Sequence, residues 1–319
     1  MMAEARTIKD RRRLGRSDLE VTSVGLGVWQ WGDTNFWGYG QGYDREDLDA
    51  VWWANIEAGV NFIDTAEIYG HGASETIVGD LLDDTDAPMV IATKLYPEKD
   101  SHLEVRKAAE GSLRRLGVDV IDLYQVHWWP PRMDVRGMMR ELDTLVRDGL
   151  VRYVGVSNFS VEQVEEAQSH LEHTEIVSNQ VHYSLLHRDP ETEGLVDHHG
   201  KNGIAIIAYS PIEQGILTGK FGPDNRPGGF RAKKPRFSRE GLEAVQPVLA
   251  ELDAAAKAHG RTMAQAAMAW LLKDPNVVVI PGAKNLTQLE ENVGCADWQL
   301  TQAEVDRIEA AYREYAKRF

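Results

Sequence analysis

The chain has 319 residues, of which 43% are hydrophobic and 27% charged, a balance typical of globular proteins with a buried core. No apolar run reaches the roughly 18 residues that a membrane-spanning helix needs, and no signal-peptide pattern follows the charged start, so we expect a cytoplasmic protein. The formal net charge of -15 argues against a nucleic-acid partner, because phosphate backbones bind positive surfaces.

Eight short apolar runs along the chain predict β-strands. They cover residues 22–27, 61–64, 89–94, 120–127, 151–157, 175–180, 203–210 and 277–282. Their apolar residues are continuous instead of alternating, which is typical of parallel strands covered by helices.

Amphipathic patterns between these runs predict helices. The clearest cover residues 44–59, 73–84, 102–117, 133–149 and 160–170, and several open with Asp, Ser or Thr and close with Gly, as helix caps require. Eight strand–helix units without a break in composition favour an α/β fold, one (β/α)₈ TIM barrel, which typically occupies about 250 residues. We therefore expect a single domain over residues 1–319.

The remaining residues lie outside the eight units. Residues 11–20 predict an N-terminal β-hairpin, residues 222–237 a Gly/Pro/Arg-rich loop after the seventh strand, and residues 301–319 an additional C-terminal helix. A doubly wound sheet is the alternative, but its dinucleotide fingerprint needs a third glycine where Gln30 follows Gly25 and Gly27.

Polar side chains end most of the predicted strands. One such residue is commonly structural, but a ring of them predicts a site, because the active sites of barrels lie at the carboxyl ends of the strands. The residues at these ends are Asp64, Lys94, His127, Ser157, Asn158, Gln180, Tyr209 and Ser210.

Four residues at or near these strand ends can act together in proton transfer. A tyrosine has an ordinary pKa of about 10, so we expect Lys94 to lower the pKa of Tyr69 for proton transfer near neutrality. A buried lysine needs a carboxylate partner to stay charged, and Asp64 fits that role. His127 can donate to a carbonyl oxygen and stabilise the charge that develops there.

Seven segments spread over the chain carry motifs in a characteristic order and spacing. They are DTAEIYG (residues 64–70), ATK (92–94), IDLYQVHWW (121–129), GVSNFS (155–160), SNQVHYS (178–184), YSPIEQGILTGK (209–220) and IPGAKNLTQLEEN (280–292). In these segments the chain resembles the aldo-keto reductase superfamily. The resemblance implies that Tyr69 is the general acid/base, that Asp64 and Lys94 tune it, and that His127 orients the substrate.

The resemblance also implies a nicotinamide cofactor held without a Rossmann domain. In that interpretation Ser157, Asn158 and Gln180 bind the carboxamide and Tyr209 stacks on the nicotinamide ring. The pyrophosphate lies on Ser210, Pro211, Ile212, Gly215, Leu217 and Lys220, and the adenosine end on Gly282, Ala283, Lys284, Gln288, Glu291 and Asn292. Gly27, Val28, Trp29 and Asp64 complete the predicted cofactor contacts.

The choice between NADPH and NADH depends on the adenosine end. The helix start after residues 281–285 offers free amides to an anion, and Lys284 can contact a ribose phosphate, which favours NADPH. Family members specific for NADPH often carry an arginine where Gln288 stands, so NADH stays open.

Five of the nine tryptophans follow the first and fourth predicted strands: Trp29, Trp31, Trp37, Trp128 and Trp129. Some of them can simply cap the core. We expect Trp29 and Trp128 to line a substrate pocket, suited to flat apolar molecules or to sugar C–H faces.

Two further groups are interpreted as structural. Cys295 is the only cysteine, which excludes an internal disulfide, and no nucleophile motif surrounds it. His182, His187, His198 and His199 cluster in the sequence, but His198 and His199 are interpreted as solvated residues near a helix end, so we expect no metal site.

The resemblance and the polar strand ends together predict an NADP-dependent oxidoreductase acting on a small-molecule carbonyl or alcohol. The alternative is a cofactor-binding regulatory subunit resembling potassium-channel β subunits. A barrel lyase or isomerase is a third option, but it would have no use for the cofactor residues. The physiological substrate, the direction of reaction and the oligomeric state are not fixed by the sequence.

Overall fold

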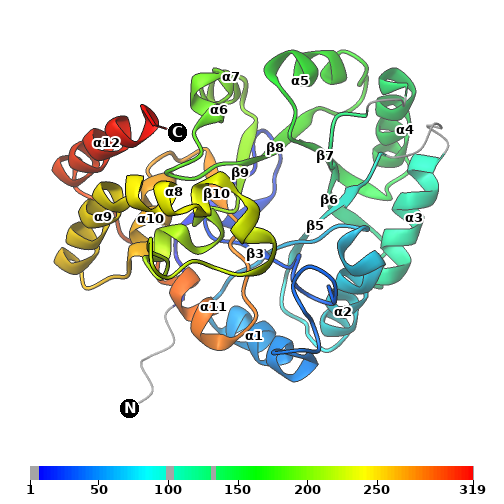
Figure 1. Ribbon diagram of the computed structural model, residues 1–319. Helices are drawn as coiled ribbons and strands as arrows, with labels where there is room; N and C mark the ends of the chain where they lie inside the picture. Colours follow the sequence, from blue (N-terminus) through cyan, green and yellow to red (C-terminus); the bar gives the residue numbers. More distant parts are fainter. Residues whose placement is uncertain (1–6, 98–103, 131–133, 319) are drawn as a thin grey trace.

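Eight parallel strands form the centre of the molecule. The computed structural model describes residues 7–97, 104–130 and 134–318. The strands lie in chain order in one sheet, with helices arranged around it (Figure 1). They are β3 (Leu26–Gly27), β4 (Phe62–Asp64), β5 (Val90–Leu95), β6 (Ile121–Val126), β7 (Val151–Ser157), β8 (Ile176–His182), β9 (Ala205–Tyr209) and β10 (Val277–Val279).

The sheet closes on itself between its first and last strands. Isolated parallel bridges join Val24 to Val279 and Gly27 to Gly282, and the amide of Gly25 donates to the carbonyl of Val279 at 2.8 Å. A side chain on Gly27 would lie 2.7 Å from the carbonyl oxygen of Ile280, so the seam needs glycine there. The prediction of a (β/α)₈ barrel is confirmed.

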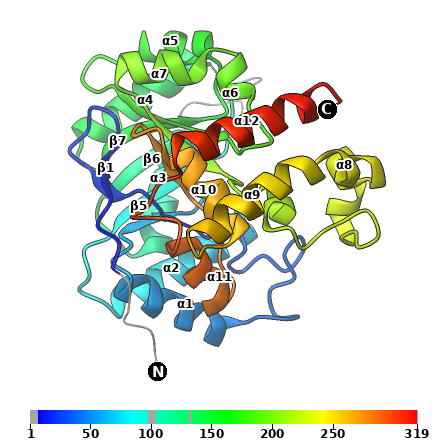
Figure 2. The same cartoon turned by 90° about the vertical axis from the view of Figure 1, so that its left-hand side faces the viewer.

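The predicted N-terminal hairpin is present as β1 (Arg11–Arg13) and β2 (Glu20–Thr22), which pair antiparallel. Figure 2 shows it on the side of the barrel opposite the segment that contains α8 (Arg239–Ala244). Arg12 donates to the carbonyls of Leu272, Asp274 and Val277, beside the start of β10. The hairpin therefore closes the end of the barrel at which the strands begin.

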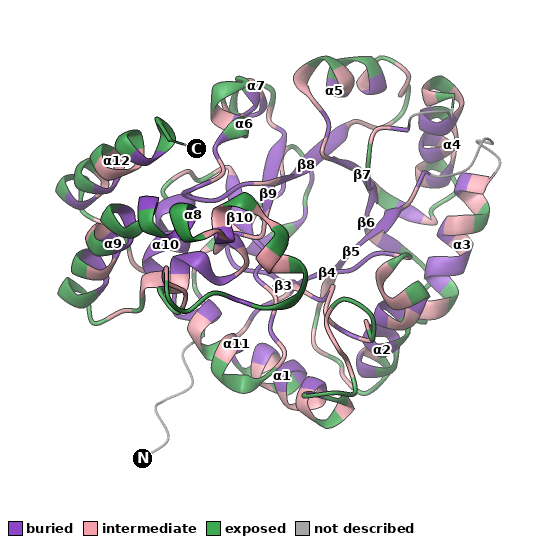
Figure 3. Cartoon of the chain, in the orientation of Figure 1, coloured by how far each residue is buried: buried purple, intermediate pink, exposed green. Residues whose placement is uncertain are grey.

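The hairpin also completes the core inside the barrel. Leu14, Leu19 and Val21 are buried in one cluster with inward residues of the strands, such as Phe62 and Ile207. Two larger clusters lie between the strands and the helices. The strands are accordingly buried, while the helices expose their outer faces (Figure 3).

The predicted helices are confirmed, and three of them begin with a capping box at Asp44, Ser160 or Thr301. A helix that was not predicted begins with a fourth capping box at Thr262. Residues 102, 103 and 133 of the predicted helices lie outside the described residues. The helices other than α8 are α1 (Arg45–Glu57), α2 (Ala73–Asp83), α3 (Glu104–Leu116), α4 (Val135–Arg147), α5 (Val161–Gln168), α6 (Asp189–Thr192), α7 (Leu195–Asn202), α9 (Gln246–Ala258), α10 (Met263–Leu272), α11 (Leu286–Val293) and α12 (Gln302–Ala316).

The boundaries of several elements differ from those expected; the last strand, for example, ends at Val279 where the sequence predicted residue 282. Thr22 belongs to the hairpin instead of the first barrel strand, and the regular part of that strand is only β3. The loop expected at residues 222–237 contains two 3₁₀ turns, η3 (Gly229–Lys233) and η4 (Pro235–Phe237). The C-terminal helix ends at Ala316, and Phe319 lies outside the described residues.

None of the helices in the described ranges is long and apolar enough to cross a membrane.

Candidate active site

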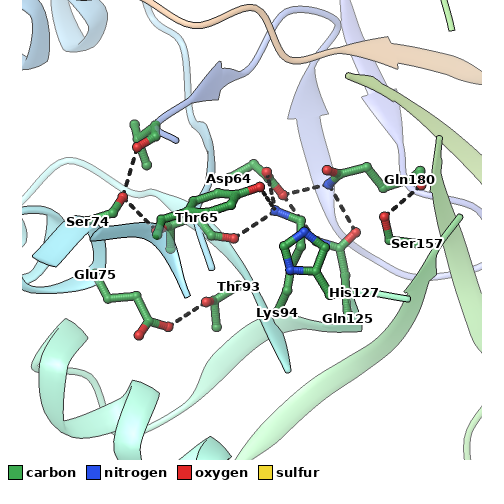
Figure 4. A network of polar contacts seen from close by, with 12 residues as sticks. Asp64, Thr65, Ser74, Glu75, Thr93, Lys94, Gln125, His127, Ser157 and Gln180 are labelled. Carbon is green, nitrogen blue, oxygen red and sulfur yellow. Dashed lines mark hydrogen bonds and ion pairs between the residues drawn. The ribbon is translucent and has the colours of Figure 1, made fainter. Parts of the chain in front are cut away.

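Four predicted residues meet at the carboxyl ends of the strands. Asp64 is the last residue of β4, Lys94 lies near the end of β5, and His127 follows β6 directly. Tyr69 begins the short turn η1 (Tyr69–Gly72) in the loop after β4. Figure 4 shows the side chains of Asp64, Lys94 and His127 gathered at this point.

Lys94 is the centre of this arrangement. Its Nζ donates to Asp64 Oδ1 at 2.6 Å and to the carbonyl oxygen of Thr65 at 2.8 Å, and it lies 3.3 Å from the hydroxyl of Tyr69. The side chains of Lys94 and Asp64 are 0% and 2% exposed, so this is a fully buried ion pair. Its position fixes the tyrosine hydroxyl relative to the barrel.

The second oxygen of Asp64 binds two amides. Gln125 Nε2 donates to Asp64 Oδ2 at 3.1 Å and Gln180 Nε2 at 2.7 Å. Gln125 was not predicted, although it is the one polar side chain within the otherwise apolar end of β6. Both amides satisfy the second oxygen of this buried carboxylate.

The pKa of Tyr69 differs from the expectation. Burial is the largest influence and raises it, Lys94 lowers it in part, and Asp64 raises it again, so the pKa lies above its ordinary value. Lys94 lowers this pKa as expected, but the net value is not low, because burial, and then the charge of Asp64, outweigh the effect of Lys94. Tyr69 is therefore a protonated phenol at neutral pH.

The pKa values of Lys94 and His127 are shifted in opposite directions. Burial lowers the pKa of Lys94, but Asp64 and Tyr69 outweigh it, and the pKa lies above its ordinary value. Burial and then the charge of Lys94 hold the pKa of His127 well below its usual range, so its imidazole is neutral. Its ring lies 5.7 Å from that of Tyr69, and its Nδ1 has no hydrogen-bond partner within the described residues.

The predicted carboxamide residues adjoin this group. Ser157 Oγ donates to the carbonyl of Gln180 at 2.8 Å, and the Nδ2 of Asn158 donates to the carbonyl of His127 at 3.1 Å. The hydroxyl of Tyr209 donates to Asn158 Oδ1 at 3.0 Å. These residues are brought together as expected, and their contacts with a cofactor stay a prediction.

The loop after β9 has an unusual backbone. Ser210, Glu213 and Gln214 have φ values of 52°, 49° and 51°, in the left-handed region that non-glycine residues rarely adopt. Loops with such residues form concavities of backbone N–H groups that bind anions. The same loop contains Pro211, Ile212, Gly215 and Leu217, and it continues to Lys220 through the 3₁₀ segment η2 (Glu213–Thr218).

Three cations lie close enough to influence one another. Burial, and then the charge of Arg231, lowers the pKa of Lys220, and burial followed by Arg231 and Lys220 lowers that of Lys284. Arg231 was not predicted, and the only signal for it was its place in the Arg-rich loop. A cluster of like charges that depress one another is suited to a polyanionic ligand.

The start of α11 lies beside this cluster. The Lys284 amide donates to Gln288 Oε1 at 2.9 Å, and Asn292 Nδ2 donates to the Gly282 carbonyl at 3.2 Å. Gln288 and Asn292 are thus engaged within the protein. Glu291 raises the pKa of Lys220 through its charge, so it faces the same cluster.

Two of the residues that were predicted to contact the cofactor are buried. Val28 is 0% exposed, and its carbonyl accepts from Ser74 Oγ at 2.9 Å. Ala283 is also 0% exposed, and its carbonyl accepts from Trp31 Nε1 at 3.1 Å.

The tryptophans divide into two groups. Trp31 is fully buried, and Trp129 packs against Phe159 with ring centroids 5.1 Å apart, so both are structural. Trp29 lies 6.0 Å from the ring of Tyr69, and Trp128 stacks on His127 at 6.2 Å and is 46% exposed. Trp29 and Trp128 therefore flank the four central residues.

Further aromatic side chains, which were not predicted, lie next to Trp29 and His127. Phe36 stacks on Trp29 at 4.9 Å and meets Phe230 of η3 at 5.0 Å. Tyr96 lies 5.9 Å from His127.

One histidine prediction is wrong. His199 is fully buried beside Asn179, and burial followed by the charge of His198 lowers its pKa to about 4. Its place in α7, against the barrel, explains why a helix-end position did not leave it solvated. Across the described parts of the chain, no three His, Cys, Asp or Glu side chains are grouped to hold a metal ion. Cys295 is buried, and burial raises the pKa of its thiol, which argues against a nucleophile.

Comparisons with known proteins agree with this geometry. The model of the Aldo/keto reductase family matches residues 23–313. An uncharacterized oxidoreductase of Mycobacterium bovis is 40% identical over 93% of this chain and 91% of its own. The chloroplastic pyridoxal reductase of Arabidopsis thaliana is 32% identical over 94% of this chain and 85% of its own. A crystal structure of an aldo/keto reductase from Klebsiella pneumoniae in complex with NADP and acetate has a TM-score of 0.77 and 27% identity, covering 96% of both chains.

Proposed function

Because the chain belongs to the aldo/keto reductase family, we propose that it is an NADPH-dependent reductase of aldehydes and ketones, able to run in reverse as an alcohol dehydrogenase. The observation that carries this proposal is the contact of Lys94 Nζ with both Asp64 and the Tyr69 hydroxyl at the mouth of the barrel. The neutral imidazole of His127 beside it carries one N–H and supplies a second donor.

The side chains support proton transfer to a carbonyl oxygen. NADPH supplies the hydride that adds to the carbonyl carbon. Tyr69 donates its proton to the oxygen, and this is favourable even for a phenol of raised pKa because an alkoxide is far more basic than a phenolate. Lys94 stabilises the phenolate that remains, and His127 orients the oxygen by hydrogen bonding.

The residues at the other end of the site fit a phosphorylated dinucleotide. Lys220, Arg231 and Lys284 form a positive cluster beside the left-handed loop after β9. The buried Oε1 atoms of Gln30 and Gln214 lack partners in the described structure and are free to accept hydrogen bonds. Together with the NADP complex of the Klebsiella relative, these features support NADPH, while the neutral Gln288 leaves NADH as the second choice.

Substitution of Tyr69 by phenylalanine tests the proposal. We expect Tyr69→Phe to reduce kcat by on the order of 100-fold to 10,000-fold, because it removes only the proton donor. The dissociation constant for NADPH, measured by quenching of tryptophan fluorescence, should change less than about twofold. Tyr153→Phe is the matched control, since the hydroxyl of Tyr153 lies on the surface against Asp18.

The substrate panel should contain aldehydes, ketones, sugars and sugar alcohols, each with NADPH and NADH. Pyridoxal belongs in it because a relative is named a pyridoxal reductase. Unchanged turnover in Tyr69→Phe would refute the assigned role. Binding of NADPH without turnover of any panel member would favour a regulatory subunit, and binding of neither nucleotide would contradict both functions.

A further inference from the structure

Three rings lie parallel behind the proposed nicotinamide position. The rings of His187 and His182 are 3.9 Å apart at 13°, and those of His182 and Tyr209 are 5.3 Å apart at 14°. His182 ends β8, Tyr209 ends β9, and the two residues are paired in register, so their side chains project from the same face of the sheet. Tyr209 is the ring that we propose faces the nicotinamide, and the inference below rests on that function.

The middle ring is attached to a buried carboxylate. His182 Nε2 lies 3.1 Å from Glu213 Oε2, which also accepts from Ser184 Oγ at 2.9 Å. Glu213 Oε1 lies 3.0 Å from Arg236 Nη1, and Glu213 is only 5% exposed. Burial raises the pKa of Glu213, but the hydrogen bond and charge of His182 and the charge of Arg236 bring it down to about 2. The carboxylate is therefore ionised and fully engaged at neutral pH.

Glu213 belongs to the strained loop after β9. Its own φ of 49° and those of Ser210 and Gln214 are disfavoured for residues with a Cβ, so the loop needs a tertiary contact to keep this conformation. The three donors on the Glu213 carboxylate supply that contact. The same loop is the one that we propose binds the pyrophosphate.

The outer ring is fixed by its own turn. The amide of His187 donates to Ser184 Oγ at 3.0 Å, and the backbones of the two residues bond to each other in both directions. Asp189 Oδ2 lies 3.4 Å from His187 Nε2. His187 is therefore held in place behind His182. Together the two rings block movement of Tyr209 away from a bound nicotinamide ring.

We propose that His182 is a positioning residue for the cofactor, with two separable actions. Its ring supports Tyr209 from behind and so fixes the surface on which the nicotinamide stacks. Its Nε2, through Glu213, fixes the loop that binds the pyrophosphate. His182 does not itself belong to the group around Lys94 that transfers the proton.

Two substitutions separate the effect of the His182 ring from the effect of its hydrogen bond to Glu213. His182→Gln keeps a hydrogen-bond donor for Glu213 but removes the ring, and His182→Phe keeps the ring but removes the donor. The ligands are NADPH and 2′-phospho-ADP-ribose, which has the same pyrophosphate but no nicotinamide. Dissociation constants come from isothermal titration calorimetry, so the readout does not depend on turnover.

We expect His182→Gln to weaken NADPH binding by about tenfold and to leave 2′-phospho-ADP-ribose within about twofold. His182→Phe and Glu213→Gln should weaken both ligands by a similar factor, roughly threefold to tenfold, because the loop is common to both. In turnover, kcat at saturating NADPH should change less than about threefold in all three variants.

His198→Gln is the matched control, because His198 contacts Glu165 on the outer helices. The ratio of the two dissociation constants is independent of the fraction of protein that is folded, so partial misfolding does not affect it. An unchanged ratio in His182→Gln would overturn the role of the ring, and wild-type binding of both ligands by Glu213→Gln would overturn the role of the loop. Failure of the wild-type protein to bind any nicotinamide nucleotide would instead contradict the proposed function.

Discussion

The pair of Asp64 and Lys94 is a single buried contact that bears on stability and on the chemistry that we propose. Two charges buried at 2% and 0% exposure are tolerated only because the remaining oxygen of Asp64 binds Gln125 and Gln180. Removal of one charge leaves the other without compensation, so the pair is more costly to break than to replace as a whole.

We therefore predict that Asp64→Asn destabilises the protein by about 3 kcal/mol, while the double variant with Lys94→Met recovers part of the loss. The pKa of Lys94 is raised in the folded protein, so its stabilising contribution is fully present below its unfolded pKa of about 10.5 and is lost only as the pH rises through the higher folded value. Urea unfolding at pH 7 measures the difference in the free energy of unfolding between the wild type and each variant. Equal stability of the wild type and Asp64→Asn would show that the pair contributes nothing.

His199 predicts a loss of stability in acid. Its folded pKa of about 4 lies below its unfolded value of about 6.5, so the unfolded chain binds the proton first and stability falls as the pH drops between those values. From pH 7 to pH 5 the loss from this residue should be about 2 kcal/mol. His199→Phe should lose correspondingly less in urea titrations at the two pH values, whereas an identical acid loss in the variant would exclude His199 as the cause.

At the scale of elements, the strands and helices were predictable because local sequence decides them. Continuous apolar runs formed β4 to β10, and caps such as Asp44 and Ser160 began their helices. The first strand was overestimated because Thr22 pairs with Arg11 in the antiparallel hairpin and so does not belong to the barrel strand. The residues that carry polar motifs were found, but Gln125 and Arg231 were missed because their roles depend on which loops and strands meet.

Arg231 provides a test of the element that contains it. Arg231→Ala should weaken NADPH binding about tenfold, because η3 then contributes no charge to the cluster with Lys220 and Lys284. Arg239→Ala is the control, since Arg239 pairs with Asp224 and Glu243 on the surface. Equal affinities in the two variants would place Arg231 outside the binding site.

For the whole molecule, we propose a single domain whose strands all contribute to one site. A ligand that contacts the ends of β3 and β7 to β10 should stabilise the barrel as a unit. At 100 times its dissociation constant, NADPH should add about 2.7 kcal/mol and raise the midpoint of thermal unfolding by roughly 5 °C. Calorimetry should show one transition that shifts completely, and two transitions of which only one shifts would contradict the single domain.

The seam between β3 and β10 has a consequence for how the chain is made. The bridges from Val24 to Val279 and from Gly27 to Gly282 join the start of the barrel to residues near the end of the chain. During synthesis the ring cannot close until residue 282 has left the ribosome, so the nascent sheet keeps two unpaired edges for most of translation. Until the last strand arrives, these edges are the parts of the sheet at which the nascent chain is most exposed to aggregation.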